Sequence, residues 1–180
     1  MTEEKVDKND KKKEAVNEKH QKLAGKYLTF KLAEEVYGLE ILKVIEIIGL
    51  QDITPVPRTP DYVKGVINLR GIIHPVIDLK KKFGMGATEH TEETCIIIVV
   101  VENEEKKEQM GVMVDSVSEV VDIDADIIED APNLGMDMNS DFILGMAKAE
   151  DSVKILLNVE KVLSKSEIEK VSSAADQVPA

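Results

Sequence analysis

One arginine, Arg70, stands at the join of two apolar segments, in the stretch GVINLRGIIHPVIDL from Gly65 to Leu79. A guanidinium carries five N–H donors in a fixed planar fork, so it is suited to recognising a carboxylate of a partner. Gly71 can supply the positive φ of a tight turn, which would hold this fork out of the body of the domain. The alternative is an ion pair within the chain, with Glu46 or Asp78. The residue types alone leave both interpretations open.

An acidic segment, DIDADIIED, offers the clearest candidate for metal binding. Asp122, Asp124 and Asp126 match the first three ligand positions of a calcium-binding loop. However, Ile127 stands at the position of the loop's glycine, and Asn133 stands where a bidentate glutamate is needed. We therefore interpret the segment as a solvated acidic turn, and a calcium-binding protein is kept as the alternative from a different functional class.

No arrangement of residues typical of catalysis is recognisable. Ser116, Ser118 and Ser152 lack the G-x-S-x-G setting of a nucleophile, and Cys95 has no partner base that the sequence identifies. The three histidines lie far apart and have no second ligand at metal-binding spacing. We therefore expect no enzymatic activity, no catalytic residue, no metal and no cofactor.

Composition excludes several classes of partner. The formal net charge is −12, and such a chain repels phosphate backbones and anionic lipid. Aromatic residues make up 3% of the chain and tryptophan is missing, so platforms for stacking bases are scarce. The longest apolar run, Cys95–Val101, is far shorter than a membrane span. We expect a cytoplasmic protein with no nucleic-acid partner and no direct membrane insertion.

Strand patterns dominate from Gly25 onward. YLTFKL alternates apolar and polar residues, and VYGLEILKVIEIIGL carries short apolar runs broken by Gly38 and Gly49. The second segment also fits one face of a helix, but β-branched residues lose rotamer freedom in helices, so we favour strand. The run CIIIVVV, Cys95–Val101, is apolar at consecutive positions, so both of its faces must be covered. These patterns predict a mainly β chain with two packed subdomains.

The region around Arg70 contains three further structural signals. Thr59–Gly65 is predicted to form a short helix, because a threonine followed by proline is a favourable start and a glycine can end it. Val66–Leu69 and Ile72–Leu79 are predicted to form a hairpin. Pro75 lacks an N–H, which predicts that it lies on an edge strand or at a bulge.

The two ends of the chain differ in composition from the rest. Residues 1–24 are mostly charged or small, with no sustained apolar period, so we expect a flexible tail. A C-terminal helix is predicted over residues 159–171, with Asn158 as its N-cap. Residues 171–180 are expected to be a second flexible tail. The folded domain is thus placed at residues 25–170.

The segment YGLEILKVIEIIGLQDITPVPRTPDYVKGVINLRGIIHPVIDLKKKFG, Tyr37–Gly84, resembles the signature half of the CheW family of bacterial chemotaxis coupling proteins. The GVMVDSV segment and the order of the later strands also fit this family, through about Val162. The resemblance implies two packed five-stranded SH3-like β-barrels with a groove between them. It also implies a non-catalytic scaffold that bridges the cytoplasmic tips of chemoreceptors to the regulatory domain of the histidine kinase CheA, at the membrane only through receptor arrays.

The resemblance also implies which residues contact the partners. The positions that face the receptor in the family are occupied here by Val44, Glu46, Gly65 and Arg70. A second possibility within the family is that Glu46 and Arg70 mainly pair with each other and hold the shape of the groove. A kinase contact is expected on an exposed apolar edge of a barrel, formed by Val36, Tyr37 and Leu39.

Three residues depart from the common family pattern. Ile45 stands where many members carry glutamine, and Ile48 stands where many carry arginine, so a more apolar groove is expected. His74 replaces the hydrophobic residue that usually precedes the proline. A related alternative is the CheW-like module of a CheV-type adaptor, which would need an additional receiver domain that a chain of this length has no room for.

Overall fold

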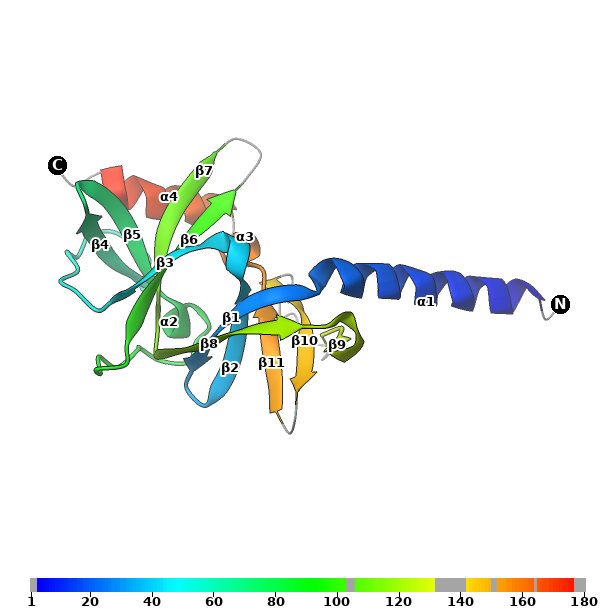
Figure 1. Cartoon of the computed structure of the whole chain (residues 1–180). Coiled ribbons are helices and arrows are strands. Elements are labelled where there is room, and N and C mark those ends of the chain that lie inside the picture. Colours follow the sequence, from blue (N-terminus) through cyan, green and yellow to red (C-terminus); the bar gives the residue numbers. More distant parts are fainter. Residues whose placement is uncertain (1–2, 103–105, 132–141, 150–151, 164, 177–180) are drawn as a thin grey trace.

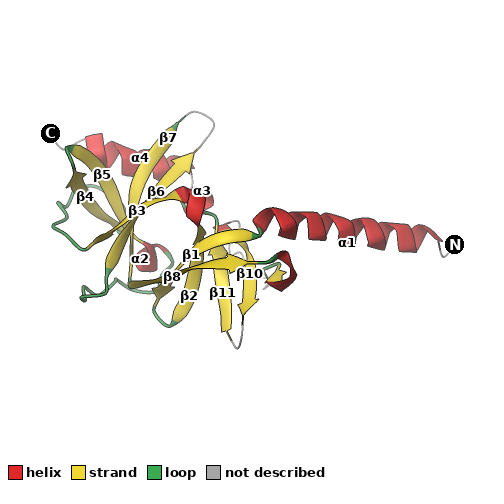
Figure 2. Cartoon of the chain, in the orientation of Figure 1, coloured by secondary structure: helices red, strands yellow, loops and turns green. Residues whose placement is uncertain are grey.

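The computed structural model describes residues 3–102, 106–131, 142–149, 152–163 and 165–176. The chain is mainly β, as predicted, and its strands form two sheets that lie side by side (Figures 1 and 2). Short helices join or cover the sheets, and one long helix extends away from them at the N-terminus.

The first sheet has six strands rather than the expected five, in the order β8-β1-β2-β11-β10-β9. Its longer strands are β1 (Gly25–Leu32), β2 (Glu35–Glu40), β8 (Ser116–Ile123), β10 (Ile143–Ala149) and β11 (Ser152–Leu157). The additional strand, β9 (Ile128–Glu129), has two residues and follows the 3-10 helix η2 (Ala125–Ile127). Strand β11 pairs in parallel with β2, so the C-terminal part of the chain completes a sheet that the N-terminal part began.

The second sheet has five strands in the order β3-β6-β7-β5-β4. They are β3 (Val44–Gly49), β4 (Val63–Leu69), β5 (Ile72–Asp78), β6 (Cys95–Glu102) and β7 (Lys107–Val114). The 3-10 helix η1 (Ile41–Lys43) separates β2 from β3 and so marks the passage between the sheets. The preference for strand over helix in this region is confirmed, because its flanks form β2 and β3.

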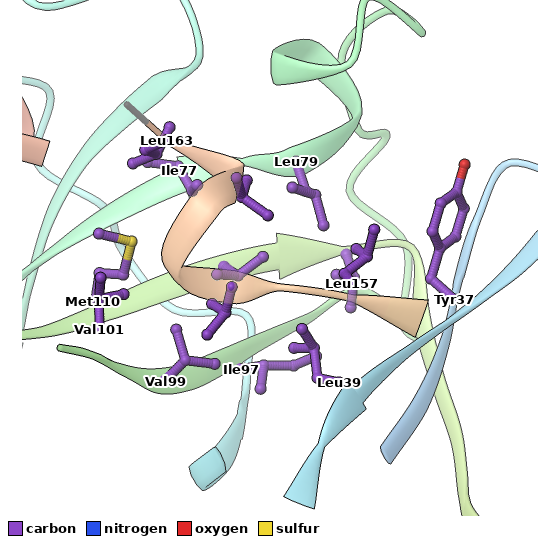
Figure 3. Packing of buried hydrophobic residues seen from close by; sticks show 14 of the residues in the cluster. Tyr37, Leu39, Ile77, Leu79, Ile97, Val99, Val101, Met110, Leu157 and Leu163 are labelled. Carbon is purple, nitrogen blue, oxygen red and sulfur yellow. The ribbon is translucent and has the colours of Figure 1, made fainter. Parts of the chain in front are cut away.

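The run CIIIVVV forms β6, and both of its faces are buried as predicted. Ile97, Val99 and Val101 belong to a large cluster shared with residues of the first sheet, including Leu39 and Leu157 (Figure 3). The side chains between them, Ile96 and Ile98, belong to a separate cluster within the second sheet. The consecutive apolar residues are therefore explained by one strand serving two cores.

The hairpin is confirmed. Strand β5 lies between β4 and β7, but its pairing with β7 begins only at Val76, so Pro75 is paired on one side, with Val66 of β4, and lies at a local edge as predicted. Val66, which lies opposite Pro75, forms its backbone hydrogen bonds with Thr54 instead. The Val66 N–H donates to the Thr54 carbonyl oxygen, and the Thr54 N–H donates to the Val66 carbonyl oxygen, both at 2.9 Å. No N–H is needed from Pro75 at this pair.

The helix predicted over Thr59–Gly65 is wrong. Residues 57–58 and 61–62 form turns, residues 59–60 have no regular structure, and β4 already begins at Val63. The Thr59 hydroxyl donates to the carbonyl oxygen of Val56 (2.9 Å), and Val63 N–H donates to that of Pro60 (3.0 Å). The local helix signals are overridden because this segment pairs along the sheet, which is a tertiary interaction.

The expectation of an irregular N-terminal tail is corrected for Glu3–Leu23, which form helix α1. Lysine and glutamate are good helix formers, and pairs such as Glu18 and Lys22 stand four residues apart, so a helix forms without an apolar face. Its last turn contacts the first sheet: the Tyr27 hydroxyl donates to the carbonyl oxygen of Leu23 (2.7 Å). Among the described residues, no helix combines the length and hydrophobicity of a membrane span.

The C-terminal region forms two helices instead of one. Helix α3 (Val159–Val162) begins at Asn158, whose side chain accepts a hydrogen bond from Glu160 N–H, so the predicted N-cap is confirmed. The chain then becomes extended at Leu163 and continues as α4 (Lys165–Asp176). Helix α4 continues beyond residue 171, where a flexible tail was expected to begin, because Val171 is fully buried in the shared core. That tail prediction is therefore corrected for residues 171–176.

Asp115, between β7 and β8, ties the two sheets together. Its Oδ2 accepts a hydrogen bond from Ala33 N–H in the β1–β2 turn (2.7 Å) and lies 3.4 Å from Lys80 Nζ in helix α2 (Leu79–Lys82). We expect Asp115→Ala to lower the free energy of unfolding by roughly 1–2 kcal/mol, because a charge-assisted bond is lost. Urea unfolding would measure this, with the exposed Asp52→Ala as control; equal effects of both substitutions would contradict the assignment.

Candidate partner-binding site

The structure brings together Glu46 and Arg70, which the sequence places 24 residues apart. Glu46 lies on β3, and Arg70 lies in the β4–β5 turn. Strands β3 and β4 are the two edge strands of the second sheet. The bridge between Thr54 and Val66 closes the sheet by joining the chain after β3 to β4. The Arg70 Nη2 then reaches Glu46 Oε2 and forms an ion pair.

The tight turn at Arg70 explains why a guanidinium stands between two buried strands. Arg70 (φ 53°) and Gly71 (φ 87°) both have positive φ, as the favoured two-residue hairpin turns require. Asn68 Oδ1 accepts a hydrogen bond from Gly71 N–H (2.9 Å) and fixes the turn. The Arg70 side chain remains 74% exposed, whereas Asp78, the other candidate partner, is fully buried and bonded to Thr88. The arginine is thus presented at the surface and oriented by Glu46.

Val44 and Glu46 lie on either side of an irregularity in β3. The register against β6 shifts between them, so Ile45 is the additional residue. Val44 is half-buried against the shared core, while Ile45 and Ile47 are 45% and 44% exposed. Ile45 and Ile47 therefore form an exposed apolar strip on β3. The substituted position Ile48 instead packs toward the interior of the second sheet.

Leu42, in η1, is a further exposed apolar residue that the sequence patterns did not single out. Its side chain is 90% exposed, in the 3-10 helix that leads directly into β3. The sequence did contain an indication of this, because the leucine two residues before β3 does not fit the pattern of buried apolar residues in a strand. It could not be interpreted without knowing that a 3-10 helix separates β2 from β3.

Gly65 is buried in β4 and supports the site from behind. Its φ is +142°, and a Cβ atom at this position would lie 2.1 Å from the Thr54 carbonyl oxygen. Glycine is therefore required for the close approach that closes the sheet. The structure assigns Gly65 a role in the shape of the surface that carries Glu46 and Arg70, since its own atoms are covered.

His74 is a buried titratable residue whose pKa both charges of this pair affect. It is 7% exposed on β5, and burial lowers its pKa; a backbone hydrogen bond with Gln109 and the Glu46 charge oppose this effect, whereas the Arg70 charge adds to it. Because burial dominates, the folded chain holds this imidazole in its neutral form more strongly than the unfolded chain does.

This shift predicts that stability decreases in mild acid. The unfolded chain binds the His74 proton below about pH 6.5, whereas the folded chain binds it only at lower pH, so the unfolding free energy falls as the pH drops through this range. We expect His74→Leu to reduce the difference in unfolding free energy between about pH 7.5 and 5.5. Urea titrations of both proteins would test this, and an identical pH dependence would contradict it.

The exposed apolar edge expected for a kinase contact is not present at the predicted residues. Strand β2 lies between β1 and β11 and is not an edge. Tyr37 and Leu39 are 8% and 2% exposed and belong to the shared core, and Val36 is half-buried. The short apolar runs of this segment predicted a strand, but they could not show that neighbouring strands cover it on both sides.

The candidate calcium ligands belong to different structural elements. Asp122 lies on β8 opposite Lys26, Asp124 precedes η2, and Asp126 lies within η2. Across the described part of the chain, no group of three histidine, cysteine or acidic side chains is arranged to hold a metal ion. The acidic segment is thus part of a strand and its exit rather than of a single loop.

Comparisons with known proteins agree on one family. The CheW-like domain matches residues 26–167. A protein named Chemotaxis protein CheW from Klebsiella aerogenes is 36% identical over 159 residues, covering 86% of this chain and 93% of its own length. The crystal structure of the scaffolding protein TtCheW from Thermoanaerobacter tengcongensis superimposes with a TM-score of 0.70 at 38% identity, covering 80% of this chain and 90% of its own. The Chemotaxis protein CheV3 of Helicobacter pylori is 32% identical over 132 residues, which are 72% of this chain and 42% of that protein.

Proposed function

Because this chain belongs to the CheW-like domain family, we propose that it is a non-catalytic chemotaxis scaffold that couples chemoreceptor tips to the histidine kinase CheA. It would act in the cytoplasm, and it would reach the membrane only through the receptors. The observation that carries the proposal is the ion pair of Glu46 and the exposed Arg70, which the closure of the second sheet holds at its surface.

The surface around this pair is suited to a helical partner. Val44 with the exposed Ile45 and Ile47 offers apolar contact, and Arg70 offers donors that a receptor carboxylate can share with Glu46. Opposite charges at fixed positions set the register of a partner more than they add affinity. Gly65 contributes indirectly, through the position of the chain at Thr54.

Because β2 is not an edge strand, the kinase contact is proposed for the face of the first sheet around the half-buried Val36 rather than for an edge. Of the three residues implied by the resemblance, Tyr37 and Leu39 would support the surface from within, and Val36 would reach the regulatory domain of CheA itself. A contact on the first sheet leaves the pair on the second sheet open for a receptor. This separation is what a bridging scaffold requires.

A second candidate is the CheW-like module of a CheV-type adaptor. It is supported by the match to the Helicobacter pylori protein, of which this chain covers less than half. Both candidates predict the same receptor and kinase contacts, so they share one test of binding. They differ in the need for a receiver domain that accepts a phosphoryl group.

Titration calorimetry of the full chain against a receptor-tip fragment, and separately against a CheA regulatory domain, tests the proposed coupling. We expect binding to both at roughly micromolar dissociation constants, since array contacts are strengthened by multivalency. Addition of the second partner to a saturated first complex is expected to give a ternary complex in size-exclusion chromatography. Failure of the folded protein to bind either partner would overturn the proposal.

A further inference from the structure

Four of the six aromatic residues of this chain form one row of neighbouring rings. The sequence contains three phenylalanines and three tyrosines. Phe30 stacks on Tyr37 with ring centroids 5.9 Å apart, Tyr37 faces Phe83 at 6.2 Å, and Phe83 stacks on Phe142 at 5.0 Å. This row runs from the core of the first sheet outward, because Phe30 is fully buried whereas Phe83 and Phe142 are partly exposed.

The outer end of the row forms the floor of an open cleft of about 570 Å³. Its apolar walls come from the first sheet, from the segment after α2 and from α3, and include Met85, Ile143, Ile155 and Val162. This volume lies within the roughly 300–1,000 Å³ typical of ligand-binding pockets. A large apolar side chain placed here would meet the stacked Phe83–Phe142 pair and several aliphatic groups, the surroundings typical of an interface anchor.

The rim of the cleft carries charge of the opposite sign to the protein as a whole. Lys82 is ion-paired with Glu167 and also lies 4.8 Å from the centre of the Tyr62 ring, so this cation is held in place. Lys161 on α3 is exposed, and no ion pair joins it to another of the described residues. The two lysines and one glutamate of the lining leave an excess positive charge, in a chain with a net charge of −12. An acidic group near an apolar anchor would therefore be attracted to this rim.

We propose that this cleft binds a short segment of a partner protein that presents one large apolar side chain flanked by carboxylates. The apolar side chain packs against the exposed side of the stacked Phe83–Phe142 pair, and a carboxylate pairs with Lys161. The cleft lies between strands of the first sheet and helices that contact the second sheet, and neither Glu46 nor Arg70 lines it, so it is distinct from that pair. The inference does not depend on the proposed coupling of receptors to a kinase.

Three end-blocked pentapeptides test the proposal against the full-length protein: Glu-Asp-Phe-Glu-Asp, the same peptide with alanine in place of phenylalanine, and Lys-Lys-Phe-Lys-Lys. Methyl and aromatic NMR spectra would report binding. We expect the first peptide to shift signals of Phe83, Phe142 and Met85 in a saturable manner. The alanine peptide is expected to bind at least about tenfold more weakly, because the buried ring is lost. The lysine peptide is expected to bind more weakly as well.

A charge reversal on the protein completes the test. Lys161→Glu is expected to weaken binding of the acidic peptide about fivefold or more and to strengthen binding of the lysine peptide. The matched control is Lys12→Glu in α1, which changes the net charge equally on a helix that extends away from both sheets (Figure 1). Arg70→Ala is expected to leave peptide binding unchanged, which separates this site from the proposed receptor site. The proposal is overturned if the NMR signals of the cleft residues do not respond to the peptide, or if Lys161→Glu and Lys12→Glu change peptide affinity equally. It is also overturned if the free protein dimerises through the cleft.

Discussion

Replacing Gly65 with alanine is expected to cost more than about 3 kcal/mol of unfolding free energy, or to prevent folding of the second sheet. The added Cβ would lie 2.1 Å from the Thr54 carbonyl oxygen and 2.7 Å from its carbon, and both atoms belong to the backbone. No side-chain rotation can relieve that contact. The residue would also keep a φ of +142°, which L-residues rarely adopt. The bridge of Thr54 with Val66 would have to separate, and with it the closure that brings Glu46 to Arg70.

Chemical denaturation followed by circular dichroism measures this loss, and Gly49→Ala is the matched control. Gly49 lies at the end of β3 in the same sheet, has no positive φ, and has open space around its Cβ position. Its substitution should change stability by no more than about 0.5 kcal/mol. If Gly65→Ala were as stable as Gly49→Ala, the close approach to Thr54 would not be required. Any loss of receptor binding in the Gly65 variant would then need a direct contact as its cause.

Local sequence signals predicted the elements whose partners are near in sequence. The Arg70–Gly71 turn was predictable because a two-residue loop with a glycine between β-rich segments has few other conformations. The run Cys95–Val101 showed from composition alone that a strand must be covered twice. In both cases a steric or solvation requirement of a few adjacent residues determines the outcome.

The features that were missed depend on contacts distant in sequence. The helix-start signals at Thr59 predicted a helix, but pairing within the second sheet extends β4 back to Val63. The apolar residues of β2 looked available for a partner, but strand β11, more than 110 residues later, covers that edge. Likewise, Gly65 was recognised as a special position, but its reason is a carbonyl group eleven residues earlier that reaches it only after the sheet closes. Such requirements belong to the assembled sheet, and no local pattern encodes them.

Reversing the charge of Arg70 is expected to weaken binding of a receptor-tip fragment at least about tenfold, because a donor fork is lost and two carboxylates then face each other. The chain's other arginine, Arg58, is exposed in the loop before β4, so Arg58→Glu is a control with the same change of net charge. Binding of the CheA regulatory domain, measured by the same calorimetry, should be unaffected by either substitution. Equal weakening by both would indicate a general effect of charge and would contradict a specific role for Arg70.

The double variant Glu46→Arg/Arg70→Glu distinguishes the two interpretations of this pair. It restores an ion pair of opposite polarity between β3 and the β4–β5 turn, so the shape of the surface is kept while its charges are exchanged. If the pair only maintains shape, receptor affinity should return to nearly the wild-type value. If the partner recognises the guanidinium itself, the double variant should remain about as weak as Arg70→Glu, with normal thermal stability. We expect the second result, because the Arg70 side chain is 74% exposed and an exposed pair contributes at most about 1 kcal/mol to the fold. An arginine held in a fixed turn, yet contributing so little to stability, is better explained by recognition than by structure.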